Sequence, residues 1–127
     1  MKLLLLSIVS LFLMQPDQSA DLPSATDADI RAALVSGMPT LVDFGARSCI
    51  PCKKMAPILS ELESELKGKG NVLFVDVRED RKLARQYRIQ MKPTQVFFDA
   101  KGNEVKRHLG SMEKNEILAV FKELGVK

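Results

Sequence analysis

A chain of 127 residues with 46% hydrophobic and 28% charged residues has the size and composition of one globular domain. Its 19 Lys and Arg residues against 16 Asp and Glu residues give a formal net charge of +3 without a dense basic block, which argues against a nucleic-acid binder. The two cysteines, Cys49 and Cys52, are too few for a disulfide framework, so the composition excludes a disulfide-stapled miniprotein, a collagen and a disordered tail.

Residues 1–20 predict an export signal. Lys2 precedes an apolar run from Leu3 to Met14 that only two serines interrupt. This is the pattern of a signal peptide, and the run is shorter than the roughly 20 apolar residues that a membrane-spanning helix needs. We expect cleavage near Ala20 and a domain of residues 21–127, exported to a periplasm or cell envelope without stable membrane insertion. An uncleaved N-terminal anchor is the alternative.

The rest of the chain alternates between helical and strand patterns, and it contains neither an internal repeat nor a linker. Pro57 falls inside the second predicted helix and should kink it. The order of elements predicts an α/β domain with a mixed central sheet and helices on both faces. The predicted elements are a helix over 27–37, a strand over 40–44, a helix from Cys49 to the glycines at 68 and 70, a strand over 71–77, a helix over 79–87, a hairpin of strands 95–98 and 104–109, and a helix over 111–124.

The chemistry of the chain centres on the Cys49-Ile-Pro-Cys52 motif. A haem attachment site requires His after the second cysteine, where this chain has Lys53. Structural zinc needs four ligands, and His108 is the one other soft candidate. A disulfide that closes so short a loop stabilises a fold by only about 2 kcal/mol. A redox pair is the interpretation that remains.

The position of the pair suggests how it would work. The strand before it ends at Phe44, so Cys49 starts a helix, where unpaired N–H groups and the helix dipole stabilise a thiolate. We expect Cys49 to be the exposed nucleophile. Cys52, one turn further along, should be more buried and keep its proton until a mixed disulfide forms on Cys49; it then attacks and releases the partner.

The run VDFGARSCIPCKKMAPIL resembles the active-site segment of thioredoxins, and the resemblance continues through VLFVDV, KPT and Gly110. It covers nearly all of the chain after residue 25. The resemblance implies a thioredoxin fold and a thiol–disulfide oxidoreductase that needs no metal and no organic cofactor. By this resemblance the functional positions are Cys49 and Cys52 as the redox pair, Asp43 as the buried acid beneath it, Pro57 as the helix kink and Pro93 as the cis-proline that faces the disulfide.

Two of these positions, Asp43 and Pro93, have a second interpretation. Asp43 lies in an apolar strand, where burial raises the pKa of a carboxyl group and lets it accept the Cys52 proton; it could instead be a hydrogen-bonded structural residue. The backbone beside Pro93 could pair with an extended substrate peptide, or Pro93 could only end a turn. His108 lies on a predicted strand and is expected to be an exposed or packing residue rather than a ligand.

The chain departs from the usual thioredoxin pattern around the motif. It has no Trp, and Gly45 and Ser48 stand at the two positions where thioredoxins usually carry it. Ile50 replaces the usual Gly, Phe74 the usual buried Lys, and Lys92 the usual aliphatic residue before the cis-proline. These departures put the choice of substrate in question more than the chemistry.

Four basic residues flank the motif elements: Arg47, Lys53, Lys54 and Lys92. One hypothesis is that they form a basic rim that stabilises the Cys49 thiolate and favours acidic partners. The alternative hypothesis is that they only solvate the surface.

The sequence thus predicts an exported, monomeric reductant of protein disulfides. By resemblance, such a reductant receives its electrons from a membrane thiol transporter. A disulfide oxidase or isomerase is the alternative within the same chemistry. From a different class, the domain could be a peptide-binding, chaperone-like module with vestigial redox activity.

Overall fold

The computed structural model describes residues 21–127, so the predicted export signal lies outside the described residues. The elements are α1 (Asp27–Leu34), β1 (Thr40–Gly45), α2 (Ile50–Glu65), β2 (Asn71–Asp76), α3 (Arg81–Gln86), β3 (Thr94–Phe98), β4 (Glu104–Leu109) and α4 (Lys114–Glu123). Their order is the predicted one. Within the described part of the chain, no helix is both long and apolar enough to cross a membrane.

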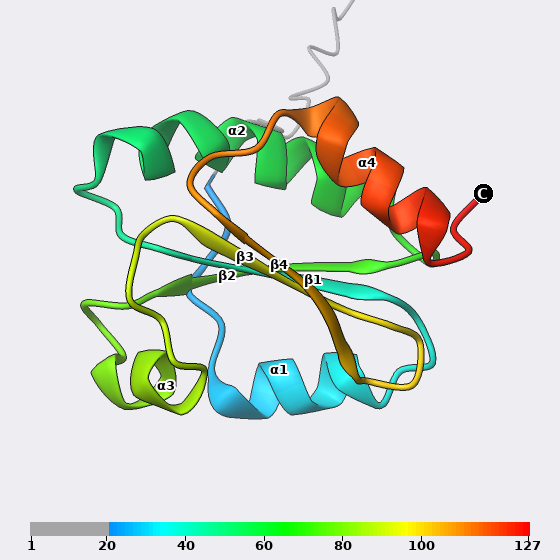
Figure 1. The fold of residues 1–127 in the computed structure, drawn as a ribbon, viewed down its shortest axis with the longest axis horizontal. Helices are drawn as coiled ribbons and strands as arrows, with labels where there is room; N and C mark the ends of the chain where they lie inside the picture. The colour runs from blue at the N-terminus through cyan, green and yellow to red at the C-terminus, as the bar shows by residue number, and fades with distance from the viewer. Residues whose placement is uncertain (1–20) are drawn as a thin grey trace, which may run out of the picture.

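The strands form one mixed sheet in the order β2-β1-β3-β4. β1 runs parallel to β2 and antiparallel to β3, and β3 and β4 form an antiparallel hairpin. In Figure 1, α2 and α4 lie on one side of the sheet and α1 and α3 on the other. The predicted α/β architecture, with a mixed sheet and helices on both faces, is therefore confirmed.

All four helices are shorter in the structure than predicted, and α2 ends at Glu65, before the glycines at 68 and 70. α1 ends at Leu34 instead of reaching Gly37. α3 begins only after Asp80, whose carboxylate accepts a hydrogen bond from the Leu83 N–H and caps the helix. α4 begins at Lys114 rather than at Ser111, because Glu113 before it has an extended backbone. Sequence periodicity locates helices better than their ends.

Residues of β1 alternate between the two faces of the sheet. Val42 and Phe44 belong to the apolar cluster that includes Ile30 of α1 and Leu83 of α3. Leu41 belongs to the other cluster, which residues of α2 and α4 complete. Since residues two apart share a face, Asp43 and Gly45 point to the same side as Leu41, beneath α2.

The two edges of the sheet differ. Beside β2, the segment before α1 forms a parallel bridge: the Ala25 N–H donates to the Phe74 carbonyl at 2.7 Å, and the Asp76 N–H donates to Ser24 Oγ at 2.8 Å. On the other edge, β4 has no outer strand partner within residues 21–127. Its register against β3 shifts between Phe97 and Phe98, and most of its side chains are exposed or half-buried polar groups.

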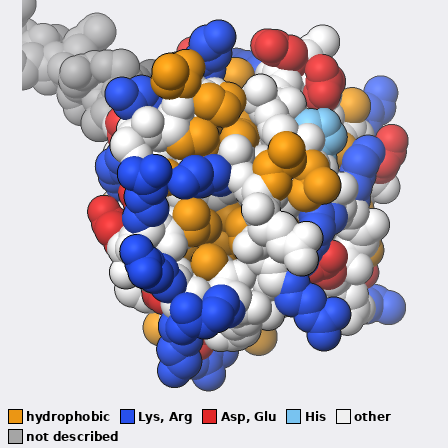
Figure 2. Space-filling model, turned by 60° about the vertical axis from the view of Figure 1, so that its left-hand side comes forward, with side chains coloured by type: hydrophobic (Ala, Val, Ile, Leu, Met, Phe, Trp, Pro, Cys, Tyr) orange, Lys and Arg blue, Asp and Glu red, His pale blue; other side chains and the backbone are white. Residues whose placement is uncertain are grey.

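The surface around the start of α2 combines apolar and basic groups. Figure 2 turns this end of the molecule toward the viewer and shows hydrophobic patches in the middle, with Lys and Arg side chains to the left and below. Three large hydrophobic side chains are exposed at elements of the predicted site: Ile50 within the motif, Met91 two residues before Pro93, and Leu109, which pairs with Thr94.

Candidate active site

Cys49 is the N-cap of α2 and is joined to Cys52 by a disulfide. Its sulfur accepts a hydrogen bond at 3.4 Å from the Cys52 N–H, a backbone donor in the first turn of the helix. Pro51 lies in the first turn, where a missing N–H costs nothing. Cys49 is half-buried, whereas Cys52 is only 5% exposed. The predicted asymmetry is therefore present, although Cys49 is less exposed than expected.

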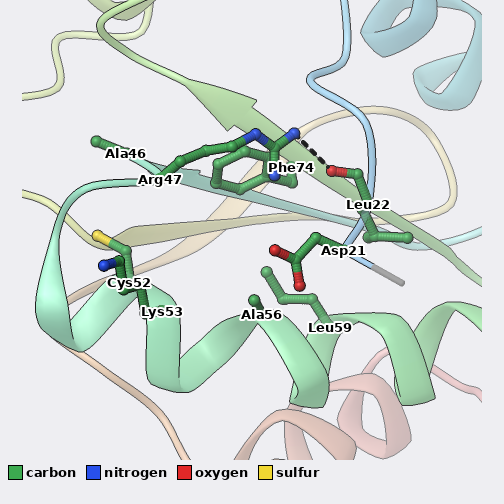
Figure 3. A pocket seen from close by; sticks show the side chains of 9 residues that line it. All are labelled: Asp21, Leu22, Ala46, Arg47, Cys52, Lys53, Ala56, Leu59 and Phe74. Carbon is green, nitrogen blue, oxygen red and sulfur yellow. Dashed lines mark hydrogen bonds between the residues drawn. The ribbon is translucent and has the colours of Figure 1, made fainter. Parts of the chain in front are cut away.

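Cys52 borders a small pocket, which Figure 3 shows from close by. On one wall, the Arg47 guanidinium stacks over the Phe74 ring, 4.8 Å from its centroid, and donates to the Leu22 carbonyl at 2.8 Å. The pocket is lined by Asp21, Leu22, Ala46, Arg47, Cys52, Lys53, Ala56, Leu59 and Phe74. The start of the described chain therefore closes one side of the redox pair.

Two departures from the thioredoxin pattern meet in this region. Gly45 has no side chain, and a Cβ there would lie 3.2 Å from both the Cys52 sulfur and the Phe74 ring. Phe74 is 7% exposed and lies where thioredoxins usually carry a buried Lys. A larger residue at position 45 would thus require Phe74 to move, so the small residue and the aromatic ring are complementary.

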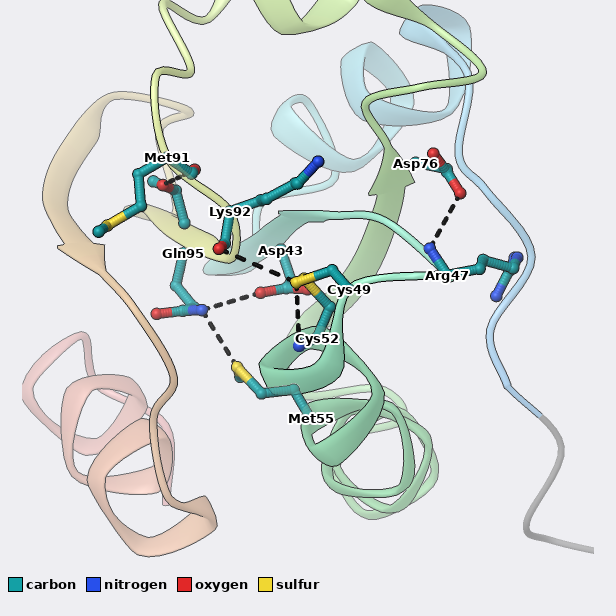
Figure 4. The surroundings of a disulfide bond; sticks show 10 residues. Asp43, Arg47, Cys49, Cys52, Met55, Asp76, Met91, Lys92 and Gln95 are labelled. Atoms are coloured by element: carbon teal, nitrogen blue, oxygen red, sulfur yellow. Dashed lines mark hydrogen bonds between the residues drawn. A yellow bond between two sulfur atoms is a disulfide. The ribbon is translucent and has the colours of Figure 1, made fainter.

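Arg47, a member of the hypothesised basic rim, lines the pocket that Cys52 and Lys53 also line. Its guanidinium is bound to Leu22 and Phe74, and its backbone N–H donates to Asp76 at 3.2 Å. Figure 4 shows the Arg47 side chain directed away from the disulfide. Lys53 and Lys54 are exposed on α2. The two hypotheses for the basic residues stay open.

Pro93 brings backbone atoms to the disulfide. The Lys92–Pro93 peptide bond is cis, as the resemblance implies. The Lys92 carbonyl oxygen lies 3.9 Å from the Cys49 sulfur, and Figure 4 shows the two facing each other. Pro93 itself is buried, and the Thr94 hydroxyl donates to the Met91 carbonyl at 2.6 Å to close the turn. A polypeptide backbone therefore runs directly beside the accessible sulfur.

Asp43 is 1% exposed and lies in the layer beneath the redox pair. It shares a face of β1 with Gly45, where an added Cβ would lie 3.2 Å from the Cys52 sulfur, and Figure 4 shows the carboxyl group behind the disulfide. Burial raises the pKa of Asp43 to about 6, against the opposing effect of a hydrogen bond from Gln95. That bond joins Gln95 Nε2 to Asp43 Oδ1 at 2.9 Å, while Oδ2 has no partner within the described residues. A carboxyl group with this pKa can exchange a proton near neutral pH.

Gln95 is the residue of this site that the sequence interpretation missed. It is fully buried, and its amide contacts Asp43, the Met55 sulfur at 3.2 Å and His108 Nδ1 at 2.8 Å. His108 is half-buried, as expected for a packing residue, and its Nδ1 also forms a hydrogen bond with Gln95. The sequence does contain a signal for this role: Gln95 is an amide in a predicted apolar strand, and pairing within the predicted hairpin places it opposite another polar residue, His108.

Within residues 21–127, no group of three or more His, Cys, Asp or Glu side chains is arranged to hold a metal ion.

Comparison with known proteins agrees with this geometry. The family model described as Thioredoxin matches residues 22–123. A thioredoxin of Rickettsia felis is 36% identical over 96 residues, which cover 75% of this chain and 90% of the relative. A thioredoxin of Staphylococcus aureus strain N315 is 38% identical over 96 residues, 76% of this chain and 90% of the relative. The crystal structure of chloroplastic thioredoxin z superposes with a TM-score of 0.71 at 26% identity, covering 83% of this chain and 95% of that one.

Proposed function

Because the chain belongs to the thioredoxin family and carries the Cys49–Cys52 pair, it is a thiol–disulfide oxidoreductase, and we propose that it works as an exported reductant of protein disulfides. The observation that carries the direction is the modest support for a thiolate on Cys49. Among the described residues, its sulfur receives one N–H, from Cys52, and faces the Lys92 carbonyl oxygen, which repels an anion. Strong disulfide oxidants depend on a highly stabilised reduced form.

The proposed reaction starts from the dithiol. The Cys49 thiolate attacks one sulfur of the substrate disulfide, forming a mixed disulfide and releasing the other substrate sulfur as a thiolate, which takes up a proton. Asp43 then accepts the Cys52 proton, and the Cys52 thiolate attacks the Cys49 sulfur. The second substrate sulfur leaves as a thiolate and is protonated in turn. Two electrons pass to the substrate, and the Cys49–Cys52 disulfide described above is the oxidised product.

The geometry beside Cys49 supports a polypeptide substrate. An extended chain can pair with the backbone that precedes Pro93, and the exposed side chains of Ile50, Met91 and Leu109 offer apolar contacts nearby. We propose that a membrane thiol transporter returns the enzyme to its dithiol form. This donor follows from the export predicted from residues 1–20.

Reduction of insulin disulfides tests the catalytic proposal. We expect turnover by the full mature chain, loss of at least about a hundredfold in Cys49→Ser because the nucleophile is gone, and near-normal turnover in the control Ser48→Ala. Equal rates for the natural chain and Cys49→Ser would contradict it. The reduction potential tests the direction: a value near about −270 mV supports a reductant, and one near about −120 mV an oxidase.

Cell fractionation of a bacterium that expresses the full chain tests export. We expect the protein outside the cytosol, with a mature N-terminus at or near Asp21 by mass spectrometry. A cytosolic chain that retains Met1 would contradict this part of the proposal without affecting the catalytic part.

A further inference from the structure

Three polar residues form a row across the sheet. Asp43 of β1 is paired with Gln95 of β3, and Gln95 is paired with His108 of β4. Directly paired residues of neighbouring strands project to the same face. The row therefore leads from the layer beneath the disulfide to the exposed edge of the sheet, through a layer that is otherwise apolar.

The Gln95 amide is held in one orientation by three contacts. Its nitrogen lies 2.9 Å from Asp43 Oδ1 and 3.2 Å from the Met55 sulfur, so each of its two hydrogens has an acceptor. Its oxygen lies 2.8 Å from His108 Nδ1, which must therefore carry the hydrogen and donate it. A rotated amide would turn its oxygen toward the ionised carboxylate and the sulfur, both acceptors, and lose the two bonds that its nitrogen donates.

This arrangement makes the two oxygens of Asp43 different. Oδ1 is occupied by the Gln95 N–H, whereas Oδ2 is buried without a partner in the described chain. Figure 4 shows the Gln95 contact on one side of the carboxyl group and the disulfide on the other. Protonation at Oδ1 would cost the hydrogen bond from Gln95, but protonation at Oδ2 keeps it.

We propose that Gln95 and His108 are positioning residues of the reaction: His108 orients the Gln95 amide, and Gln95 holds Asp43 Oδ1, so that the proton leaving Cys52 goes to Oδ2. In this step the S–H bond breaks, its electron pair stays on sulfur as the thiolate, and an O–H bond forms at Oδ2. The inference rests on the proposed role of Asp43 as the acceptor of the Cys52 proton.

No charged side chain competes with Gln95 for this role within residues 21–127. The elements packed around Asp43 present Phe74 from β2, Cys52 and Met55 from α2, and Gln95 from β3. Of these Cys52 alone is titratable, while His108 of β4 acts through Gln95, and Lys53 and Lys54 of α2 are exposed. The Gln95 hydrogen bond is thus the described interaction that favours the ionised carboxylate against its burial.

A side-chain carboxyl titration by NMR of the oxidised protein tests the proposal, because neither cysteine then titrates. In Gln95→Leu we expect the Asp43 midpoint to rise by about one to two pH units, the equivalent of one hydrogen bond to a charged group. His108→Leu should raise it by a smaller amount, since the amide is then held by Met55 and Asp43 alone. His108→Asn should restore the natural midpoint, because an Asn amide nitrogen can occupy the place of Nδ1.

Lys106→Leu is the matched control: it removes a positive charge from the same face of β4, two residues away from His108, and should leave the midpoint unchanged. An unchanged midpoint in Gln95→Leu, in a variant whose amide spectrum shows the native fold, would overturn the proposal. His108→Leu with the natural midpoint, or no recovery in His108→Asn, would overturn the part assigned to His108. Insulin reduction is measured separately, so shifted midpoints in a chain without turnover would contradict the proposed function and not the hydrogen-bond row.

Discussion

The two faces of the sheet are built from the same strands but bury different kinds of side chain. On the α1 and α3 face, strand residues such as Val42, Phe44 and Val96 form an apolar cluster. On the α2 face, Leu41 and Phe97 belong to an apolar cluster. Closer to the disulfide, the same face buries two polar side chains, Asp43 and Gln95. Because successive residues of β1 and β3 point to opposite faces, one face can be packed with apolar side chains while the other buries Asp43 and Gln95.

The buried pair Asp43 and Gln95 is thus confined to the α2 face of the sheet. Burying a carboxyl group with one oxygen unpaired lowers stability, and the apolar burial on the opposite face offsets that cost. Removing an apolar side chain from one face and neutralising the buried carboxyl group of the other should therefore change stability with opposite signs and depend differently on pH.

The largest effect is expected on the apolar face. Phe44 is fully buried, and its ring packs against Tyr87 with centroids 5.2 Å apart. Phe44→Ala should lower the free energy of unfolding by about 3–5 kcal/mol, through lost burial and the cavity left behind, equally at pH 5 and pH 8. Urea denaturation measures this. A loss below about 1 kcal/mol would show that this face is not the main source of stability.

Asp43→Asn on the other face should stabilise the protein above neutral pH. The folded state raises the pKa of Asp43 from 3.8 to about 6, so it binds the proton more tightly than the unfolded chain does. The favourable contribution of the protonated form is complete below pH 3.8 and is lost as the pH rises through about 6. At pH 8 the variant should therefore gain up to about 3 kcal/mol.

At pH 4 the Asn variant and the natural chain should unfold at nearly the same urea concentration. Glu123→Gln removes an exposed carboxylate and is the matched control; it should show no such pH-dependent difference. The Asn variant should also reduce insulin more slowly, because Cys52 loses its proton acceptor. A gain in stability that is equal at pH 4 and pH 8 would contradict burial of an ionised Asp43.

Gly45→Ala tests how tightly the layer beneath the disulfide is packed. The new methyl group would lie 3.2 Å from the Cys52 sulfur and from the Phe74 ring, so we expect a loss of about 2 kcal/mol in the oxidised protein. Phe74→Leu should recover part of this loss in a double-mutant cycle, because it shortens one of the two obstructing side chains. Additive losses would show that the Cys52 sulfur alone limits the space.

The smallest effect belongs to the cap of α1. The Thr26 hydroxyl accepts from the Asp29 N–H at 3.1 Å, and the Asp29 carboxylate accepts from the Thr26 N–H at 2.8 Å. Thr26→Ala should lower stability by about 1 kcal/mol and leave insulin reduction unchanged, while Thr26→Ser should behave like the natural chain. Slower insulin reduction by a fully folded Thr26→Ala variant would show that changes on the α1 face of the sheet affect the disulfide on the α2 face.

The sequence predicted the order of elements, the architecture and the placement of the cysteine pair at a helix start, because these depend on local periodicity and on a motif. Through the family resemblance it also predicted that Asp43 is buried and that the Lys92–Pro93 bond is cis. The ends of α1, α3 and α4 differed, because capping by Asp80 or an extended Glu113 is decided by a few hydrogen bonds and backbone angles.

The contacts of the site that the sequence did not predict depend on pairing between distant segments. Gln95 reaches Asp43 across 52 positions and His108 across 13, and only the strand register brings the three together. The sequence places Arg47 close to the motif, but it does not show that the Arg47 guanidinium contacts Leu22 and Phe74, which are far away along the chain.

Within residues 21–127, the outer edge of β4 is unpaired, and this bears on aggregation at high protein concentration. An unpaired edge strand offers N–H and C=O groups to any similar edge, the first step toward strand-to-strand aggregation. β4 presents exposed Glu104 and Lys106 and a register shift opposite Phe98. Pairing with a second molecule would desolvate these charged side chains and would have to accommodate the irregular backbone, so both features disfavour aggregation through this edge.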